Sequence, residues 1–312
     1  MRGSINERYE YQQYIIDQLK NNGYLERDAD DFDRLHAMDP ELLLKFLKAT
    51  QPKEFASLKK MYGDDLPDFI VNSVNKAATD KNGSMLDLLK HGIDIANHHL
   101  TLFYNKPATD FNPDLIKKYQ NNIFSVMQEV WATDDERVDL VLFINGIAVI
   151  SFELKSNTQH QDYRDAIMQY RKDRDPKARL FLFKAGCLVN FAMDLNEVYM
   201  TTKLEGNKTY FMPFNQGKGS GVDSGAGNPV SKNGEFSVSY MWNDILTKDT
   251  LTELIEKFIF IETKKKTDEL THKIKTVQRL IFPRYHQLDA IRKILADLKI
   301  NHTSQNYLIE HS

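Results

Sequence analysis

Two apolar runs that meet at Asn145-Gly146 limit the possible folds of this 312-residue chain more than any other feature. Asn-Gly between two such runs is the strongest short signal for a β-hairpin, so we expect two adjacent strands within residues 138–155. Three charged residues, Asp139, Glu153 and Lys155, interrupt these runs. Side chains alternate between the two faces of a strand, so Glu153 and Lys155 share a face. Burying charges without partners is costly, and the pattern therefore predicts that these groups have partners.

The turn geometry decides whether Asp139 and Glu153 can meet. A regular two-residue turn at Asn145-Gly146 would pair Asp139 with Phe152, which places Asp139 on the opposite face from Glu153. An offset of one residue restores a shared face. We therefore predict a three-residue loop with Gly146 in the left-handed conformation, which is a G1-type bulge, or another single-residue irregularity between Asp139 and Glu153.

Two carboxylates and a lysine in this setting suit metal-assisted phosphodiester hydrolysis. Mg²⁺ takes hard oxygen ligands, which Asp139, Glu153 and the backbone carbonyl of Leu154 could supply. The metal would polarise a phosphoryl oxygen and lower the pKa of a water. Lys155 could position or deprotonate that water, or stabilise charge on the phosphate. A structural salt bridge among the same residues is the alternative, and the residue pattern alone leaves both interpretations open.

A helix is predicted over residues 163–172, after the second strand of the hairpin. Its residues Gln169, Tyr170 and Arg171 could contact phosphates or support the charged cluster. A solvent-exposed helix face is the alternative for these three residues.

A second group of interest lies near the end of the sequence. Pro283 is placed to open a helix that runs to about Leu298. Phe282, Arg284 and Gln287 stand at its start. An aromatic ring can stack on adenine and a glutamine amide can form a pair of hydrogen bonds with it, so this group is a candidate nucleotide site. An ordinary helix start is the alternative.

The rest of the chain reads as helices set around strands. Residues 1–98 are mainly helical, with one helix that begins at Asp39-Pro40 and another over 84–98. Further strands are predicted at 99–104, 124–130, 180–183, 187–193, 198–202 and 209–211. A glycine-rich loop covers 215–234 and a further helix covers 247–260. Strands surrounded by helices predict an α/β or α+β fold.

Composition excludes few functions. The 41 basic and 44 acidic residues give a formal net charge of −3, which excludes a basic DNA-coating protein but not an enzyme with a local basic surface. Lys264-Lys265-Lys266 reads as a solvated helix face or a linker, with contact to DNA as the alternative. The single cysteine, Cys187, excludes an internal disulfide framework. No run approaches the ~20 apolar residues of a membrane span, so we expect a cytoplasmic protein with no membrane partner.

Several stretches, taken together and in order, resemble the restriction (R) subunit of type I restriction–modification enzymes. They are residues 38–43, 49–52, 122–126, 138–155, 165–176, 198–202, 213–217, 225–229 and 282–287. The resemblance implies a PD-(D/E)xK nuclease related to RecB, in which Asp139, Glu153 and Lys155 match the D…ExK core. It implies a restriction-endonuclease-like α/β fold with a mixed central sheet flanked by helices. Mg²⁺ would be the cofactor, double-stranded DNA the substrate, and the methyltransferase (M) and specificity (S) subunits the partners.

The same resemblance implies a division into domains. Residues 1–262 would form the endonuclease domain, with a helical part (1–98), a nuclease core (99–215) and the glycine-rich loop (215–234). Residues 263–312 would be a linker and the start of a superfamily 2, RecA-like translocase, in which Gln287 reads the adenine of ATP. A strand over 306–311 would lead into its phosphate-binding loop. The sequence contains no GxxxxGK[ST] motif, so we expect the chain to stop just before that loop and to lack ATPase activity by itself.

Two departures from the family pattern concern the site. Members of this nuclease type often carry Q-xxx-Y on the helix after the lysine; Gln159 fits that spacing formally, but we prefer Gln169 with Tyr170. Val138 stands where the motif has proline. The alternative function is a non-catalytic module for DNA binding or assembly that keeps a degenerate nuclease fold.

Overall fold

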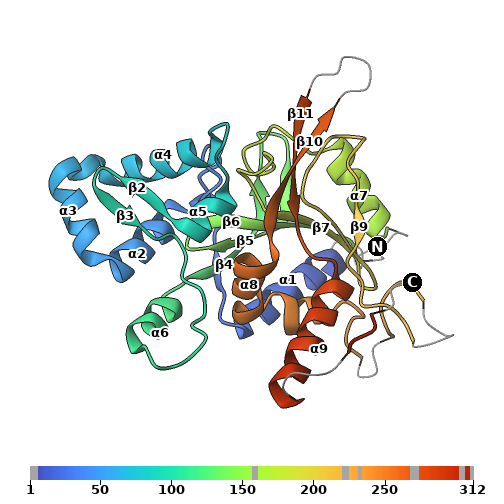
Figure 1. The fold of residues 1–312 in the computed structure, drawn as a ribbon. Coiled ribbons are helices and arrows are strands. Elements are labelled where there is room, and N and C mark those ends of the chain that lie inside the picture. Colours follow the sequence, from blue (N-terminus) through green and yellow to red (C-terminus); the bar gives the residue numbers. More distant parts are fainter. Residues whose placement is uncertain are drawn as a thin grey trace.

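A computed structural model describes residues 6–156, 161–219, 225–230, 234–267, 274–301 and 306–309. In this part of the chain one mixed seven-stranded sheet has the order β1-β4-β5-β6-β7-β8-β9 (Figure 1). The strands are β1 (Leu25–Arg27), β4 (Phe124–Trp131), β5 (Arg137–Ile144), β6 (Ile147–Leu154), β7 (Val189–Met193), β8 (Val198–Thr201) and β9 (Met212–Pro213). β1 pairs parallel to β4 and β6 parallel to β7, and the other neighbours are antiparallel. The predicted mixed α/β architecture is confirmed.

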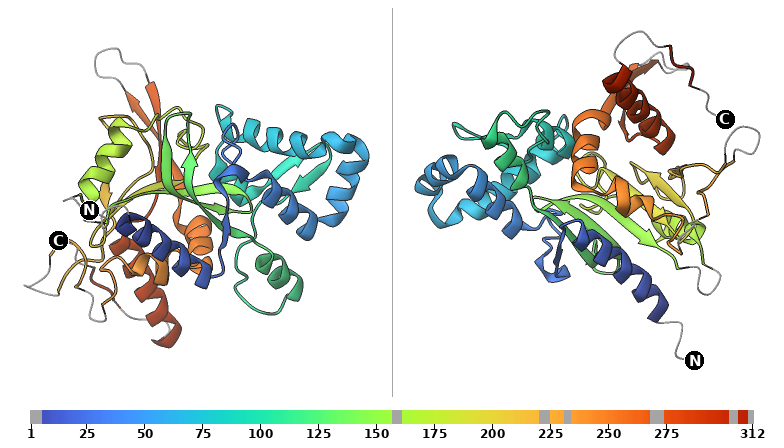
Figure 2. Two further views of the ribbon diagram at one scale, coloured as in Figure 1. Left: turned by 180° about the vertical axis from the view of Figure 1, so that it is seen from behind. Right: turned by 90° about the horizontal axis from the view of Figure 1, so that it is seen from below.

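Helices cover both faces of this sheet and form a separate cluster at one end of it (Figures 1 and 2). They are α1 (Asn6–Asn21), α2 (Pro40–Thr50), α3 (Pro52–Tyr62), α4 (Leu66–Thr79), α5 (Met85–His91), α6 (Pro113–Gln120), α7 (Tyr163–Lys172), α8 (Lys248–Glu253) and α9 (Tyr285–Asn301). Short 3₁₀ turns lie at Ala29–Asp31 and Gly63–Asp65, and π-helical turns lie at Met241–Ile245 and Leu254–Phe258. α7 packs with the side chains of one sheet face, whereas α1 and α8 pack with those of the other.

The β5–β6 turn contacts the start of α2. It lies at the opposite end of the hairpin from Asp139 and Glu153. Asp39 caps α2 by accepting a hydrogen bond from the backbone N–H of Leu42, which confirms the predicted helix start. The Asp39 N–H donates to the carbonyl of Gly146 at 2.7 Å. Asn145 and Gly146 both have positive φ, at 52° and 78°, as a two-residue hairpin turn of the primed type requires. A Cβ on Gly146 would lie 2.2 Å from the Asp39 carbonyl oxygen, so only glycine fits this close approach.

Four of the predicted elements in the middle of the chain are wrong in extent or in kind. The helix predicted over 84–98 ends at His91, because Gly92 takes a φ of 72°, and a small hairpin follows. Its strands are β2 (Ile93–Ile95) and β3 (His98–Leu100), so the strand predicted over 99–104 stops early. Residues 180–183 form turns rather than a strand, with Phe181 N–H bonded to the carbonyl of Ala178. Residues 209–211, also predicted as a strand, have no regular structure, and β9, which follows them, pairs with β8.

After residue 247 the two predicted helices are present, but the segment between them differs from the prediction. α8 continues through a π-helical turn to Phe258. Lys264-Lys265-Lys266 then lies in a strand, not in a helix or linker. β10 (Phe260–Thr267) pairs antiparallel with β11 (Ile274–Ile281), residue by residue over its whole length. α9 follows Pro283 closely, as predicted.

Two predicted segments fall partly outside the described residues. In the glycine-rich segment 215–234, a bridge between Lys218 and Gly225 closes the described part, while 220–224 and 231–233 lie outside it. Residues 306–309 have no regular secondary structure where a strand was predicted, and 310–311 lie outside the described ranges. The division near residue 262 stays a prediction, although Leu280 and Phe282 of the C-terminal segment pack in the same core as α1.

Candidate active site

The register of β5 and β6 brings Asp139 and Glu153 opposite each other. Ile144 pairs with Ile147 and Phe143 with Ala148, so the turn is a regular two-residue one and the predicted three-residue loop is wrong. The register then shifts, and Leu142 pairs with Ile150. Val149 is therefore an extra residue, a bulge that confirms the broader prediction of a single-residue irregularity. Leu140 pairs with Phe152, and the next position along places Asp139 beside Glu153 on one face.

Both carboxylates are buried and held by the backbone or by a cation. Asp139 and Glu153 are 1% and 0% exposed. Asp139 accepts a hydrogen bond at its Oδ2 from the backbone N–H of Leu154, at 2.7 Å. The N–H and C=O groups of a strand residue point toward the same neighbouring strand, so the Leu154 carbonyl also points toward β5. Aspartate, glutamate and this carbonyl thus come together as the sequence predicts.

Lys155 reaches its own partner on α7. Its Nζ donates to Oε1 of Gln169 at 2.7 Å, and its backbone N–H donates to the carbonyl of Met193 on β7. Lys155 is 8% exposed, so the ammonium group lies at the edge of the buried site. Gln159, the other glutamine considered for this supporting role, lies outside the described residues.

The other two α7 residues singled out by the sequence lie elsewhere. Tyr170 is buried, and its hydroxyl lies 2.8 Å from Oγ of Ser151, which in turn donates to Oδ1 of Asn190. Tyr170 therefore braces α7 against β6 and β7. Arg171 donates from Nε to the carbonyl of Thr209 at 3.0 Å, which directs it away from the carboxylates.

Arg174 is a site residue that the sequence analysis missed. Its Nε donates to Oε1 of Glu153 at 2.7 Å, and both side chains are almost fully buried, at 4% and 0% exposure. Its Nη2 donates to the carbonyl of Arg137 at 2.6 Å. The sequence does contain a signal for this residue. Arg174 lies seven residues after Ile167 and four after Tyr170, which is the helical spacing of the buried face of α7.

The electrostatics of the site centre on Glu153. Burial raises its pKa most, the neighbouring charge of Asp139 also raises it, and Arg174 and Lys155 lower it, so that the pKa of Glu153 is about 8. Its Oε2 is buried and has no hydrogen-bond partner among the described residues. A buried carboxylate oxygen without a partner is unusual in a native protein. This atom is therefore the one at the site that a ligand would satisfy.

The candidate nucleotide group has a different character. Phe282 is buried, with its ring 5.9 Å from that of Phe191 and 5.8 Å from that of Phe214. The Gln287 side chain accepts a hydrogen bond from the backbone N–H of Arg284 at 3.1 Å, as a residue near a helix start does. These contacts place the three residues at the beginning of α9, and their proposed role in nucleotide binding stays a prediction.

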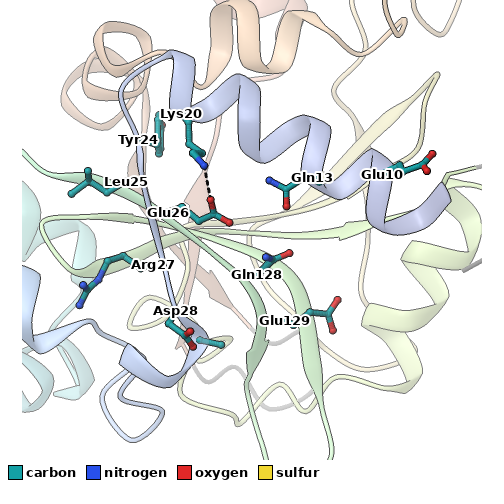
Figure 3. A pocket seen from close by; sticks show the side chains of 11 residues that line it. Glu10, Gln13, Lys20, Tyr24, Leu25, Glu26, Arg27, Asp28, Gln128 and Glu129 are labelled. Atoms are coloured by element: carbon teal, nitrogen blue, oxygen red, sulfur yellow. Dashed lines mark hydrogen bonds and ion pairs between the residues drawn. The ribbon is translucent and has the colours of Figure 1, made fainter. Parts of the chain in front are cut away.

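A groove of about 1250 Å³ lies apart from the carboxylates, between α1, β1 and β4. Figure 3 shows its lining, which mixes acidic and basic side chains such as Glu26 and Lys20, an ion pair at 2.8 Å. Glu129 on β4 lines it, but Asp139, Glu153 and Lys155 do not. The functional assignment therefore rests on the chemistry of the buried carboxylates, because the predicted catalytic residues do not line this groove.

Comparison with known proteins identifies the family. Residues 4–209 match the family described as the type I restriction enzyme R protein N terminus, and this match covers more than half of the chain. This chain belongs to that family. A protein of Methanocaldococcus jannaschii, named as the type I restriction enzyme MjaIXP endonuclease subunit, is 23% identical over 309 residues. The match covers 89% of this chain and 28% of that relative, so the chain spans less than a third of the relative's length.

The R-protein match contains the whole candidate active site. Asp139, Glu153, Lys155 and Arg174 lie within residues 4–209, whereas Phe282, Arg284 and Gln287 lie beyond them. Across the described ranges, no helix combines the length and the apolar character that crossing a membrane requires.

Proposed function

We propose that this R-protein region is a Mg²⁺-dependent endonuclease with a PD-(D/E)xK fold that hydrolyses phosphodiester bonds of double-stranded DNA. One observation carries the proposal. Asp139 and Glu153 are buried opposite each other on adjacent strands, with Lys155 on the same strand face as Glu153. Membership in a restriction enzyme family supports a nuclease role.

The residues present fit Mg²⁺. Oε2 of Glu153 is a buried oxygen that has no hydrogen-bond partner in the described chain, beside a second carboxylate. The described residues contain no cluster of three or more acidic, histidine or cysteine side chains that could bind a metal. Two carboxylates, a backbone carbonyl and waters suffice for Mg²⁺, which retains several waters and needs no all-protein cage.

Each residue would have a separate task in the reaction. Mg²⁺, when bound, would supply Lewis-acid polarisation of a phosphoryl oxygen and a lowered pKa for the attacking water. Asp139 and Glu153 would hold the ion, with the Leu154 N–H fixing the first carboxylate and Arg174 fixing Oε1 of the second. The Lys155 ammonium group would stabilise the charge that develops on the phosphate, and Gln169 would orient it by accepting one of its hydrogens.

One contact favours the alternative of a degenerate, non-catalytic nuclease fold that serves DNA binding or assembly. The ion pair between Arg174 and Glu153 already gives the buried carboxylate a cation at 2.7 Å, as a purely structural pair would. This contact uses only one of the two carboxylate oxygens, which is why we prefer the metal site. The two functions differ in whether the protein binds a divalent cation.

Metal binding therefore tests the proposal directly. Calorimetric titration of the chain with Mn²⁺ should show binding that Glu153→Gln and Asp139→Asn each remove. Both changes keep the side-chain volume, and far-UV circular dichroism checks that each variant is folded. A wild-type chain that gives no heat of binding would leave the degenerate fold as the better account.

Cleavage in the assembled enzyme tests the role of Lys155. Lys155→Ala should abolish DNA cleavage while ATP hydrolysis and translocation continue. Lys172→Ala, at an exposed position on the same helix as Gln169, is the matched control and should cleave normally. Equal loss of all three activities in Lys155→Ala would assign the lysine a structural role.

The wider assembly is part of the same proposal. Cleavage would follow ATP-driven translocation by a superfamily 2 motor that begins after residue 262, with Phe282, Arg284 and Gln287 at its adenine site. The M and S subunits would be partners in the cytoplasm, with the DNA sequence read by the S subunit. The support is the family membership, together with the position of Gln287 at the start of α9.

A further inference from the structure

The ribbon formed by β10 and β11 extends beyond the body of the molecule (Figures 1 and 2). Each strand has eight residues, so the ribbon is about 26 Å long at ~3.3 Å per residue. Only its base is fixed to the core. Leu280 is 3% exposed and its carbonyl accepts a hydrogen bond from Thr202, whereas Ile274 at the outer end is 67% exposed. An isolated two-stranded ribbon is at best marginally stable, and no described residue of the outer half belongs to a buried core cluster.

The outer half of this ribbon is densely basic. Its four residue pairs are Lys264 with Val277, Lys265 with Thr276, Lys266 with Lys275, and Thr267 with Ile274. Four of these eight residues are lysine and none is acidic. In the register of the two strands, Lys266 is paired with Lys275. A chain with a net charge of −3 thus has a concentration of basic residues on this ribbon.

The geometry points to duplex DNA as the partner of this basic ribbon. We propose that the outer half of β10–β11 binds the phosphate backbone of duplex DNA, at a site separate from the carboxylates. A two-stranded ribbon fits the major groove, which is about 12 Å wide. Lysine and threonine are typical donors to phosphate oxygens, whereas protein interfaces concentrate aromatic anchors and are depleted in lysine. The choice of DNA as the partner rests on the proposed function.

The contacts at the base of the ribbon would hold the whole β10–β11 ribbon in one orientation. Lys184, on the loop before β7, donates to Oε1 of Gln278 at 2.9 Å. Arg279 is exposed and pairs across the ribbon with Glu262, which also forms an ion pair with Lys264. That surface ion pair is exposed and weak, so phosphate can displace it at little cost.

The salt dependence of DNA binding tests this inference. The ribbon variant is Lys264→Gln, Lys265→Gln, Lys266→Gln and Lys275→Gln combined. The control variant is Lys45→Gln, Lys48→Gln, Lys53→Gln and Lys60→Gln, which removes the same charge from exposed positions on α2 and α3. Binding of a fluorescent duplex to the 312-residue chain is followed by anisotropy in EDTA over a series of salt concentrations.

The expected result is a change of slope as well as of affinity. Each phosphate contact contributes about −0.9 to the slope of log K against log salt, so the ribbon variant should lose about 2 to 4 from the slope. Its affinity at low salt should fall at least tenfold more than that of the control variant. Replacing the four lysines by arginine should retain the wild-type slope.

Failure would be specific to the ribbon. A ribbon variant that binds DNA with the slope and affinity of the control variant overturns the inference, and so does a defect confined to assembly with protein partners. Because binding in EDTA does not involve the carboxylates, these results leave the nuclease proposal standing. Loss of Mn²⁺ binding or of Lys155-dependent cleavage would be seen in separate assays.

Discussion

Replacing Glu153 by glutamine should stabilise the metal-free protein, and more so as the pH rises. Glutamine keeps the shape of the side chain and can still accept a hydrogen bond from Arg174, but it cannot ionise. Burial and the charge of Asp139 raise the pKa of Glu153 from 4.5 to about 8. The folded state therefore holds the proton more tightly than the unfolded state does. The stability due to this proton is complete below pH 4.5 and is lost as the pH rises through about 8.

The magnitude follows from the size of the pKa shift. Each pKa unit corresponds to about 1.36 kcal/mol, so the raised pKa should lower the free energy of unfolding by roughly 2 kcal/mol at pH 6 and roughly 4 to 5 kcal/mol at pH 9, relative to a side chain that does not ionise. The Glu153→Gln variant avoids this cost. Its free energy of unfolding should exceed that of the wild type by these amounts, with a difference that grows by about 2 to 3 kcal/mol between the two pH values.

Urea unfolding in EDTA at pH 6, 7.5 and 9 measures this difference. Glu256→Gln, at an exposed position, is the control and should change the free energy of unfolding by less than about 0.5 kcal/mol at each pH. A difference between Glu153→Gln and wild type that does not vary over this pH range would refute the assignment of a strongly raised pKa to Glu153.

Adding Mg²⁺ should narrow the difference in stability between wild type and Glu153→Gln at high pH. A ligand that binds only the folded state stabilises it by about 2.7 kcal/mol at a hundred times its dissociation constant. Wild type should therefore gain stability in Mg²⁺ at pH 9, where Glu153 is ionised, and Glu153→Gln should not respond. An equal response of both proteins to Mg²⁺ would place the ion elsewhere.

Three further substitutions test single contacts by urea unfolding. Arg174→Met should lower the free energy of unfolding by about 3 to 5 kcal/mol above pH 8, because it leaves the ionised Glu153 buried without its cation. Arg174→Lys should lower it by less, and equal losses in the two variants would argue against the guanidinium contact. Gly146→Ala should lower the free energy of unfolding by more than about 1 kcal/mol, because residue 146 has a positive φ and a Cβ there would lie 2.2 Å from the Asp39 carbonyl oxygen. An unchanged free energy of unfolding would mean that the turn can move. Tyr170→Phe should cost about 1 to 2 kcal/mol through its buried hydroxyl contact, and no cost would show that the hydroxyl is satisfied otherwise.

Elements with local signals were predictable from the sequence. The hairpin at Asn145-Gly146, the Asp39 helix cap and the helix 163–172 are specified by residues close in sequence, and the structure confirms them, although the hairpin loop has two residues rather than the predicted three. Gly92 shows the limit of such reasoning. It ends α5 early by taking a left-handed conformation, although the apolar spacing on either side continues as a helix would.

Features that depend on distant partners were not predictable. The spacing from Ile167 and Tyr170 places Arg174 toward the buried face of α7, but its partner Glu153, 21 residues earlier, is known only once α7 is packed on the sheet. Lys264-Lys265-Lys266 resembles a linker when it is considered alone, because it becomes a strand only by pairing with β11. No Asn-Gly or similar turn signal between the two strands predicts that pairing. Both misses come from long-range pairing, which periodicity within one segment cannot report.

The bulge at Val149 connects the fold to the chemistry. The turn fixes the register at Ile144 with Ile147, and a regular ladder from that point would pair Asp139 with Phe152 and turn the two carboxylates to opposite faces. The extra residue shifts the register only beyond the bulge. The turn therefore keeps its contact with the start of α2, while Asp139 and Glu153 at the other end of the hairpin come to lie on the same face. Burial and the charge of Asp139 raise the pKa of Glu153, so the folded protein loses stability when this carboxylate ionises. A sheet selected for stability alone would have no reason to combine an irregular strand with that cost, whereas the proposed metal site would need both carboxylates buried on one face.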